Sequence, residues 1–357
     1  MKPDILISEI MKQFKPAGIL LILALLSPGC ARQVMQTANP ALKDGRYDSE
    51  FPYRNCANEL EEITRSVKKV NSYATYRTYV FGENSEITLR DLSGSDLFEK
   101  AKARIENNES VSGTALVISY SGDKLALLTC AHVAVFPDTI IHWSEHSDLQ
   151  SNRFIHSISL KTNQQLYIRD IPEGGRIQVL ASDSKNDIAI LGRTVNQPAL
   201  PVKVFSYPVG YSDQLEWGSF IYLVGYPLGQ LMVTKGIVSK PAEKNGNFMT
   251  DASFNEGFSG GIVMAVRDGV PNFELVGIGR AVSARTGYSL KPEKQIHEYA
   301  YNPAIPYNGN IFVHEEKEIN YGITFVIPVN KVRQFYMDNR GRILGQGYNL
   351  DPFFSEK

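Results

Sequence analysis

The segment GFSGGIVMAV, residues 257–266, decides the fold that we expect from this sequence. It places Ser259 on a glycine-rich turn and follows that turn directly with five apolar residues. An apolar run of this length, rich in β-branched residues, is typical of a buried strand. Glycines permit backbone conformations that other residues avoid, so neighbouring N–H groups can converge on one point. A serine presented in this way is a candidate nucleophile for acyl transfer.

Two further motifs supply what a serine nucleophile needs. His132 lies at the end of an apolar run, and Asp187 lies at the start of another. A histidine can take the proton of the serine and later give it to the leaving group, and a carboxylate fixes the tautomer of that histidine. We therefore predict His132, Asp187 and Ser259 as the catalytic residues. The backbone N–H groups of Gly257 and Ser259 are the predicted oxyanion hole.

The rest of the chain favours an all-β protein. Short apolar or alternating runs, separated by Gly, Pro, Asn and Asp, predict strands at 73–81, 114–119, 125–129, 177–181, 188–191, 220–224, 231–239, 262–266, 273–282 and 322–327. Helical spacing occurs only near the two ends of this region. It predicts a helix that begins at Asn58, with that residue as its N-cap, and a second helix over 330–339.

Composition excludes several classes of function. The 357 residues carry 37 basic and 38 acidic side chains without a long basic block, so nucleic acid is not an expected partner. Three cysteines are too few for a disulfide scaffold. The predicted chemistry requires neither a metal nor an organic cofactor, and we expect none.

The first 30 residues have the pattern of an export signal. Two lysines precede an apolar run, 17–26, which is about half the ~20 residues that a membrane-spanning helix needs. The Gly-Cys pair at the end of this region resembles the end of a bacterial lipobox, in which the cysteine is lipidated, although the two residues before it differ from the usual pair. We predict an exported protein of the cell envelope or periplasm, anchored to a membrane through lipid on Cys30. The alternative is an ordinary cleaved signal.

The order His, Asp, Ser in a β-rich chain resembles that of the chymotrypsin-fold serine proteases. The closest similarity is to the bacterial high-temperature-requirement (HtrA/Deg) branch. It rests on the segments SGTALVI (112–118), VGYPLG (224–229), GIVS (236–239) and GITFVIPV (322–329). The resemblance implies two six-stranded antiparallel barrels, with His132 and Asp187 from the first and Ser259 from the second. It also implies an endopeptidase that acts on unfolded or damaged envelope proteins.

The same resemblance suggests how the chain is divided. We expect a signal at 1–30, a flexible tether at 31–57, a first barrel at 58–195, a second barrel with a closing helix at 196–340 and a tail at 341–357, with 196–204 as the linker between barrels. Two stretches, 82–109 and 283–320, are predicted as insertions. After residue 339 we see no room for the PDZ domain that many such proteases carry, so PDZ-controlled activation is not expected.

The specificity pocket follows from the resemblance alone. Its floor would be Ser253, and its walls would run along Gly279, Arg280 and Ala281. Because no acid stands at Ser253, a small apolar residue before the cleaved bond is a better expectation than a basic one. Arg280 either biases the site towards acidic substrates or is an exposed strand residue.

Other patterns are weaker. Cys130 stands two residues before His132, but a residue there would point into the core, so we expect a small buried cysteine and a free Cys56. The histidines of 142–146 lack the register of a zinc helix, and Gly277-Ile-Gly279 lacks the third glycine of a dinucleotide site. An α/β-hydrolase esterase would need a helix directly after Ser259. A catalytically silent barrel protein that acts as an envelope binding module is the remaining alternative.

Overall fold

The structure is a computed structural model of the whole chain. The residues that it describes are 43–51, 54–82, 85–94, 96–144, 154–168, 170–171, 177–195, 202–243, 246–292, 302 and 304–355, of which 281–286, 315, 317–319 and 321 are described by their backbone alone. The predicted signal, Cys30 and most of the predicted tether lie outside these residues. No helix in the described ranges has the length and apolarity to cross a membrane. Arg46–Lys357 form one compact unit, and every feature below lies in it.

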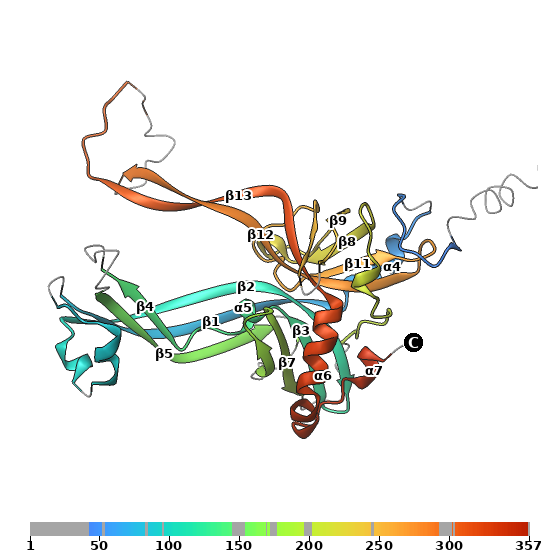
Figure 1. The fold of residues 1–357 in the computed structure, drawn as a ribbon, viewed down its shortest axis with the longest axis horizontal. Helices are drawn as coiled ribbons and strands as arrows, with labels where there is room; N and C mark the ends of the chain where they lie inside the picture. The colour runs from blue at the N-terminus through green and yellow to red at the C-terminus, as the bar shows by residue number, and fades with distance from the viewer. Residues whose placement is uncertain are drawn as a thin grey trace, which may run out of the picture. The chain divides into compact units, whose positions relative to one another are not determined.

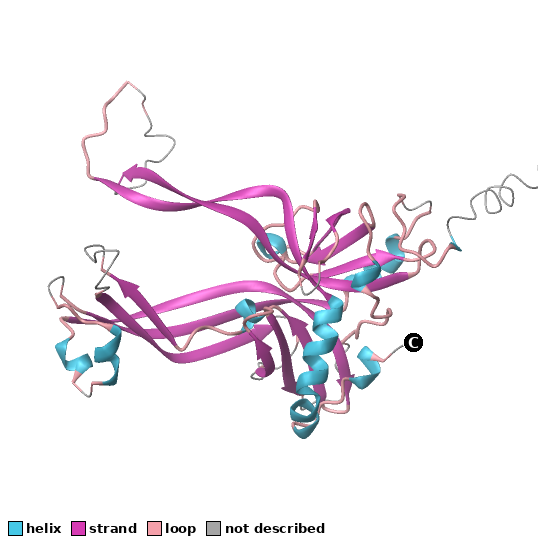
Figure 2. Cartoon of the chain, viewed as in Figure 1, coloured by secondary structure: helices cyan, strands magenta, loops and turns pink. Residues whose placement is uncertain are grey.

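Strands dominate the fold, which confirms the predicted all-β class (Figures 1 and 2). The first half of the unit is a seven-stranded antiparallel sheet in the order β4-β5-β1-β2-β3-β7-β6. Its strands are β1 (Val67–Val80), β2 (Ala103–Ser121), β3 (Lys124–Thr129), β4 (Thr139–Trp143), β5 (Ile155–Ile168), β6 (Gln178–Asp183) and β7 (Ile188–Thr194). The family resemblance implied six strands here, and the apolar pattern marked five of the seven; β4 was missed because it has only five residues, and β5 because many of its residues are polar.

The second half is a closed antiparallel barrel in the order β10-β13-β12-β11-β8-β9, as expected. Its strands are β8 (Phe220–Gly225), β9 (Met232–Lys240), β10 (Phe248–Thr250), β11 (Ile262–Val266), β12 (Phe273–Pro292) and β13 (Ile311–Pro328). The apolar run after the serine turn is β11, and all five of its residues are buried. It pairs with β8 on one side and with β12 on the other. The turn that carries Ser259 therefore leads into a strand that has a partner on both sides.

The two predicted insertions differ in structure: only the last part of 82–109 is strand, whereas 283–320 begins and ends in strand. Within 82–109 lie two short 3₁₀ helices, η2 (Leu89–Ser93) and η3 (Leu97–Lys100), and then β2, which pairs with β1 from Val80↔Ala103 onwards. Within 283–320, β12 and β13 continue as a two-stranded ribbon as far as Pro292↔Ile311. Figure 1 shows this ribbon leaving the barrel. The ribbon mixes polar residues with exposed apolar ones such as Tyr288, Leu290 and Phe312, so no regular apolar alternation marked it as a pair of strands.

Helices precede the first strand and follow the last one. α4 (Ala57–Thr64) forms where a helix was predicted, but its N-cap is Cys56, and the Asn55 side chain accepts the Ala57 N–H at 2.9 Å, so the prediction of Asn58 as the cap was wrong. α6 (Val329–Gly345) confirms the second predicted helix and is longer than expected.

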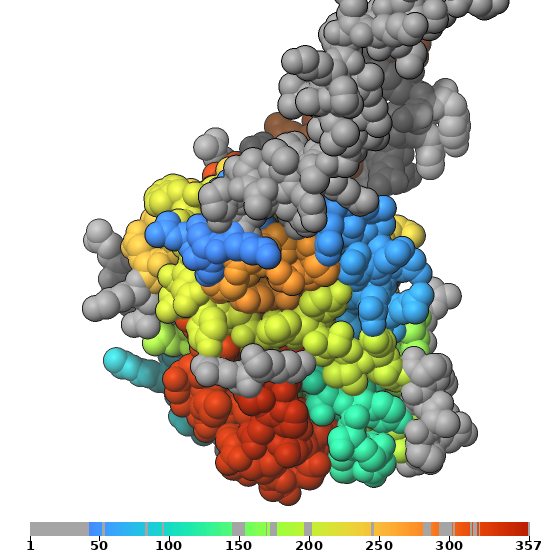
Figure 3. All heavy atoms as spheres, turned by 90° about the vertical axis from the view of Figure 1, so that its right-hand side faces the viewer, coloured from blue at the N-terminus to red at the C-terminus, as the bar shows by residue number. Residues whose placement is uncertain are grey.

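The segment 341–357, which we expected to be a tail, adds to the core. A fourth helix, α7 (Asp351–Phe354), follows α6, and the side chains of Tyr348, Leu350, Phe353 and Phe354 are buried. In Figure 3 the C-terminal segment (red) lies beside the turn between β2 and β3 (green). The Lys124 ammonium, at the start of β3, lies 5.4 Å from the centre of the Tyr348 ring.

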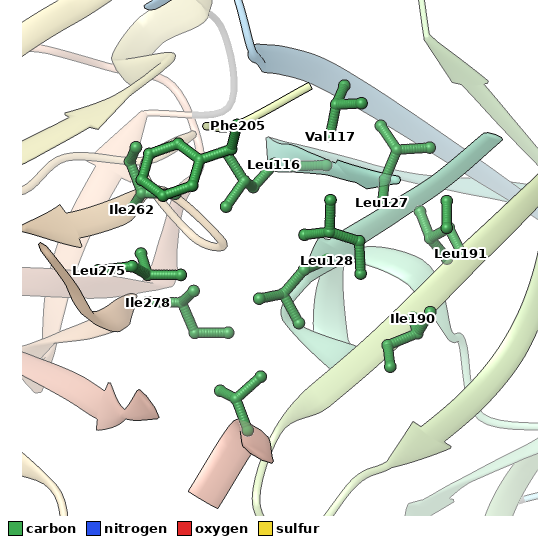
Figure 4. Close-up of a cluster of buried hydrophobic side chains, with 14 of the residues drawn as sticks. Leu116, Val117, Leu127, Leu128, Ile190, Leu191, Phe205, Ile262, Leu275 and Ile278 are labelled. Atoms are coloured by element: carbon green, nitrogen blue, oxygen red, sulfur yellow. The ribbon is translucent and has the colours of Figure 1, made fainter. Parts of the chain in front are cut away.

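One hydrophobic cluster joins the two halves (Figure 4). Leu116, Leu128 and Ile190 of the first sheet belong to it together with Ile262 and Ile278 of the barrel, and each of these side chains is fully buried. Close-packed interiors deform little. The loops that project from the two halves are therefore held in a fixed relation to each other, and the predicted site residues lie on those loops.

Candidate active site

The histidine stands on a single helical turn that follows β3. This turn, α5 (Ala131–Ala134), buries Ala131, Val133 and Ala134, so the side chain between them is turned outwards. The His132 side chain is 44% exposed, which leaves its ring accessible to a substrate. The hydrophobic residues around the histidine thus fix its direction without covering it.

The aspartate lies in the turn between β6 and β7. The carboxylate of Asp183 organises this turn, because it accepts the backbone N–H groups of Lys185 at 2.8 Å and Asn186 at 3.1 Å. Asp187 itself has a left-handed backbone with φ 62°, which Asp tolerates better than most residues. Its side chain is only 8% exposed and points into the interior of the site.

His132 and Asp187 are joined by three hydrogen bonds. The His132 Nδ1 atom lies 2.8 Å from Oδ2 and 3.0 Å from Oδ1 of Asp187, and the His132 backbone N–H donates to Oδ1 at 2.9 Å. A carboxylate at Nδ1 favours the tautomer that carries its proton there, which leaves Nε2 free to accept a proton. This is the arrangement of a general base held by an acid.

The carboxylate of Asp187 stays ionised. Burial raises its pKa, but the hydrogen bonds and charge of His132 and the charge of Arg280 outweigh this effect, so the pKa lies below its usual value. The Arg280 Nε atom donates to Oδ2 of Asp187 at 3.2 Å. A negative charge is therefore present behind the imidazole at neutral pH, where it can stabilise an imidazolium.

Ser259 is half-buried on the turn between β10 and β11. Its hydroxyl donates to the carbonyl oxygen of Arg280 at 3.2 Å, and no hydrogen bond of the described residues joins it to the His132 ring. Proton transfer thus requires the hydroxyl to turn from this carbonyl towards Nε2 of His132. Side-chain rotations of this kind occur in picoseconds to nanoseconds.

The backbone around Ser259 leaves two N–H groups free. The Glu256 carbonyl accepts the Leu228 N–H at 2.9 Å, and the Phe258 carbonyl accepts the Gly261 N–H at 2.7 Å. In a trans peptide the N–H points away from the C=O. The N–H groups of Gly257 and Ser259, which follow these two carbonyls, are accordingly turned to the opposite side.

The other N–H groups of this loop are occupied: Phe258 donates to Asn255, Gly260 to Gly279 and Gly261 to Phe258. Among residues 257–261, only Gly257 and Ser259 have an N–H without an acceptor in the part of the chain that the structure describes. These are the two donors predicted for the oxyanion hole. Gly257 has φ 99°, and a Cβ atom there would clash with the Tyr226 carbonyl oxygen, so the position requires glycine.

One residue that sequence reasoning missed holds this loop to the first sheet. Thr114, on β2, is fully buried, and its hydroxyl donates to the Gly257 carbonyl at 2.7 Å and accepts the Tyr226 N–H at 2.9 Å. Its backbone N–H donates to the Ser259 carbonyl at 2.8 Å. In sequence Thr114 is an ordinary residue of an apolar strand, and no local signal marks it.

The predicted pocket residues have different surroundings. Ser253 is exposed, whereas its neighbour Phe254 is buried and lies against Gly279, where an added Cβ would come within 2.8 Å of the phenyl ring. The Arg280 side chain reaches Asp187. Of Ala281 only the backbone is described, and it pairs with Phe325. The assignment of a pocket to these residues stays a prediction.

Cys130 is fully buried, as expected, and its thiol donates to the Gly279 carbonyl at 3.3 Å. Its sulfur and the ligand atoms of His132 and Asp187 lie within 4.8 Å of one another, as in a metal site. The residues do not fit this use, because burial raises the pKa of the thiol well above its usual value and the carboxylate is already bound to His132. Cys56 and Cys130 are both free, as predicted.

Comparison with known families agrees with this site. Residues 113–278 match the family model of the trypsin-like peptidase domain, a span that contains His132, Asp187 and Ser259. No curated protein matches the chain. Residues 113–278 are thus similar to a trypsin-like peptidase domain, and the seven-stranded sheet and the closed barrel agree with the two-barrel chymotrypsin fold. Together these findings support a chymotrypsin-fold serine protease.

Proposed function

We propose that this protein is a serine endopeptidase. Ser259 Oγ attacks the carbonyl carbon of the cleaved peptide bond while Nε2 of His132 takes its proton. The N–H groups of Gly257 and Ser259 bind the oxyanion, and the imidazolium gives its proton to the leaving amine. Water, activated by His132, then hydrolyses the acyl-enzyme and releases Ser259. Asp187 holds the tautomer of His132 and stabilises its charged form.

The pairing of Asp187 with Nδ1 of His132 is the observation that carries this proposal. Without this contact either tautomer of the imidazole would be available, and Nε2 would not be reserved as a base. The free N–H groups of Gly257 and Ser259 add the second requirement, a stabiliser for developing negative charge. Such a donor contributes about 2.7–4 kcal/mol to transition-state binding in a comparable oxyanion hole.

Labelling with a fluorophosphonate tests the proposal, because this probe forms a covalent adduct with an activated serine. The full chain should gain one adduct, visible as an increase in intact mass. Ser259→Ala should gain none, and His132→Ala and Asp187→Asn should react at least about a thousand times more slowly. An unlabelled wild-type chain would contradict the proposal. That result would favour a catalytically silent barrel protein that binds partners. In such a protein the Ser259 hydroxyl would keep its hydrogen bond to the Arg280 carbonyl and would not turn towards His132.

The more specific part of the proposal concerns place and substrate. We propose that the enzyme resembles the HtrA/Deg branch, is exported, and is anchored in the cell envelope through lipid on Cys30. Its substrates would be unfolded or damaged envelope proteins. Palmitate labelling that disappears in Cys30→Ala is the expected result for the anchor, and labelling that persists in this variant would contradict it. Cleavage of a reduced, unfolded protein but not of its native form is expected for the substrate.

A further inference from the structure

Arg280 contacts both ends of the proposed triad. Its carbonyl oxygen accepts the hydroxyl of Ser259 at 3.2 Å, and its Nε atom donates to Oδ2 of Asp187 at 3.2 Å. The same Oδ2 atom accepts Nδ1 of His132 at 2.8 Å. One residue of β12 is thus bonded to the nucleophile through its main chain and to the acid through its side chain.

The bond between Arg280 and Asp187 is partly shielded from water. The Asp187 side chain is 8% exposed and that of Arg280 is 40% exposed. Charge-assisted hydrogen bonds are stronger than neutral ones, and screening weakens them less when one partner is buried. The Asp187 carboxylate therefore has two cationic neighbours when His132 is protonated, and one when it is neutral.

Other charged groups face this pair from neighbouring elements. The pKa of the Lys331 ammonium, on α6, is lowered. Burial is the main cause, and repulsion from the nearby Arg280 adds to it. Arg280 also lines an open cavity of about 360 Å³ together with Lys240 and Glu243, which form an ion pair of their own at 2.8 Å. None of these three groups bonds to Asp187 in the described residues. Cys130, which also faces Asp187, is uncharged.

We propose that Arg280 is a positioning residue of the active site, which fixes the Asp187 carboxylate and limits how strongly it favours the imidazolium form of His132. This inference rests on the proposed function. Arg280 occupies one lone pair of Oδ2 and places a positive charge across the carboxylate from the imidazole. Both effects weaken the hold of Asp187 on a protonated ring. Because its carbonyl also binds Ser259, Arg280 helps to fix the position of the nucleophile relative to the acid.

The consequence for the reaction has a definite sign. Loss of the guanidinium makes the imidazolium more favourable, so His132 takes up its proton at a higher pH. The acidic limb of the activity profile then moves to higher pH, because only the neutral imidazole can accept the proton of Ser259. The carboxylate also loses one of the hydrogen bonds that fix its orientation, which lowers the rate even where His132 is neutral.

Three variants of the full chain separate these effects. Arg280→Ala removes the charge and the bond, and Arg280→Lys keeps a charge without the guanidinium geometry. Lys331→Gln is the matched control, because it removes a neighbouring cation that does not contact Asp187. The first readout is the titration of the His132 ring by NMR with ¹⁵N-labelled histidine, which does not depend on activity. The second is the pH profile of fluorophosphonate acylation.

In Arg280→Ala the His132 titration and the acidic limb should both move to higher pH. Acylation at the pH optimum should fall about tenfold to a hundredfold, the range of one charge-assisted hydrogen bond. Arg280→Lys should restore at least half of the pH shift, and Lys331→Gln should acylate within about twofold of wild type. The inference is overturned if the His132 titration does not move in Arg280→Ala. It is also overturned if Arg280→Ala and Arg280→Lys lose the same amount of acylation rate. If the His132 titration moves as expected in Arg280→Ala but the wild type does not acylate, the proposed function alone is refuted.

Discussion

Replacement of Thr114 by valine tests how the nucleophile loop is held. Valine keeps the volume and the β-branched shape, so the strand and its packing are retained, but it removes the hydroxyl. That hydroxyl is fully buried and makes two hydrogen bonds, to the Gly257 carbonyl at 2.7 Å and from the Tyr226 N–H at 2.9 Å. Thr114→Val therefore leaves one buried acceptor and one partly buried donor without these partners.

The size of the effect follows from these two groups. Each buried polar group that loses its partner costs about 1–3 kcal/mol, so the free energy of unfolding should fall by about 2–6 kcal/mol. The loop should also be held less firmly, because it loses the bond at the Gly257 carbonyl and keeps only the one from the Thr114 backbone N–H to the Ser259 carbonyl. We expect acylation of Ser259 to slow by at least about tenfold at a temperature where the variant is folded, since displaced oxyanion donors cost about 10²–10³ in rate.

Urea unfolding followed by tryptophan fluorescence gives the stability, and fluorophosphonate labelling gives the rate. Thr114→Ser is the control, because it keeps the hydroxyl and loses only a methyl group; it should acylate at nearly the wild-type rate. A Thr114→Val protein within about 0.5 kcal/mol of wild type, and equally reactive, would show that Thr114 does not hold the loop.

Three other predictions concern separate parts of the chain. Gly257→Ala should lower acylation by about 10²–10³-fold, because its Cβ would collide with the Tyr226 carbonyl and displace an oxyanion donor; unchanged labelling kinetics would refute this. The hydrogen bond from Arg340 lowers the pKa of Asp351 from its ordinary 3.8 to about 2, so this pair stabilises the fold above about pH 4 and loses its effect between about pH 4 and pH 2. Asp351→Asn should hence be less stable than wild type at pH 6 and equal to it below about pH 2 in urea unfolding. Cys130 should resist iodoacetamide in the native protein and react in urea, because burial raises the pKa of its thiol; rapid native alkylation, seen by peptide mass, would contradict this.

Local sequence determined the candidate site residues and most of the strands. Ser259 could be found because glycines stand on both sides of it and a buried strand follows. His132 and Asp187 could be found because each stands at the boundary of an apolar run, where a strand ends or begins. Such features depend on backbone preferences and apolar runs within a few residues, which a sequence shows directly. The order of the three residues then favoured one fold.

Two other features of the fold could not be predicted from the local sequence pattern. The ribbon of β12 and β13 looked like a loop, because polar residues and exposed apolar residues such as Leu290 and Phe312 are mixed in it without a regular alternation. The buried aromatic side chains near the C-terminus looked like a tail, because too few residues separate them from the chain end to form a periodic pattern.

Only the tertiary structure decided how the site is held together. Thr114 lies 143 residues from Gly257, and Arg280 lies 93 residues from Asp187, yet each pair shares a hydrogen bond. These partners meet because the barrel closes with a particular strand order and because a hydrophobic cluster fixes the two halves of the unit against each other. A hydrogen bond requires positions accurate to a few tenths of an ångström. Local backbone preference and apolar pattern set no distance between residues so far apart along the chain, whereas the register of paired strands does.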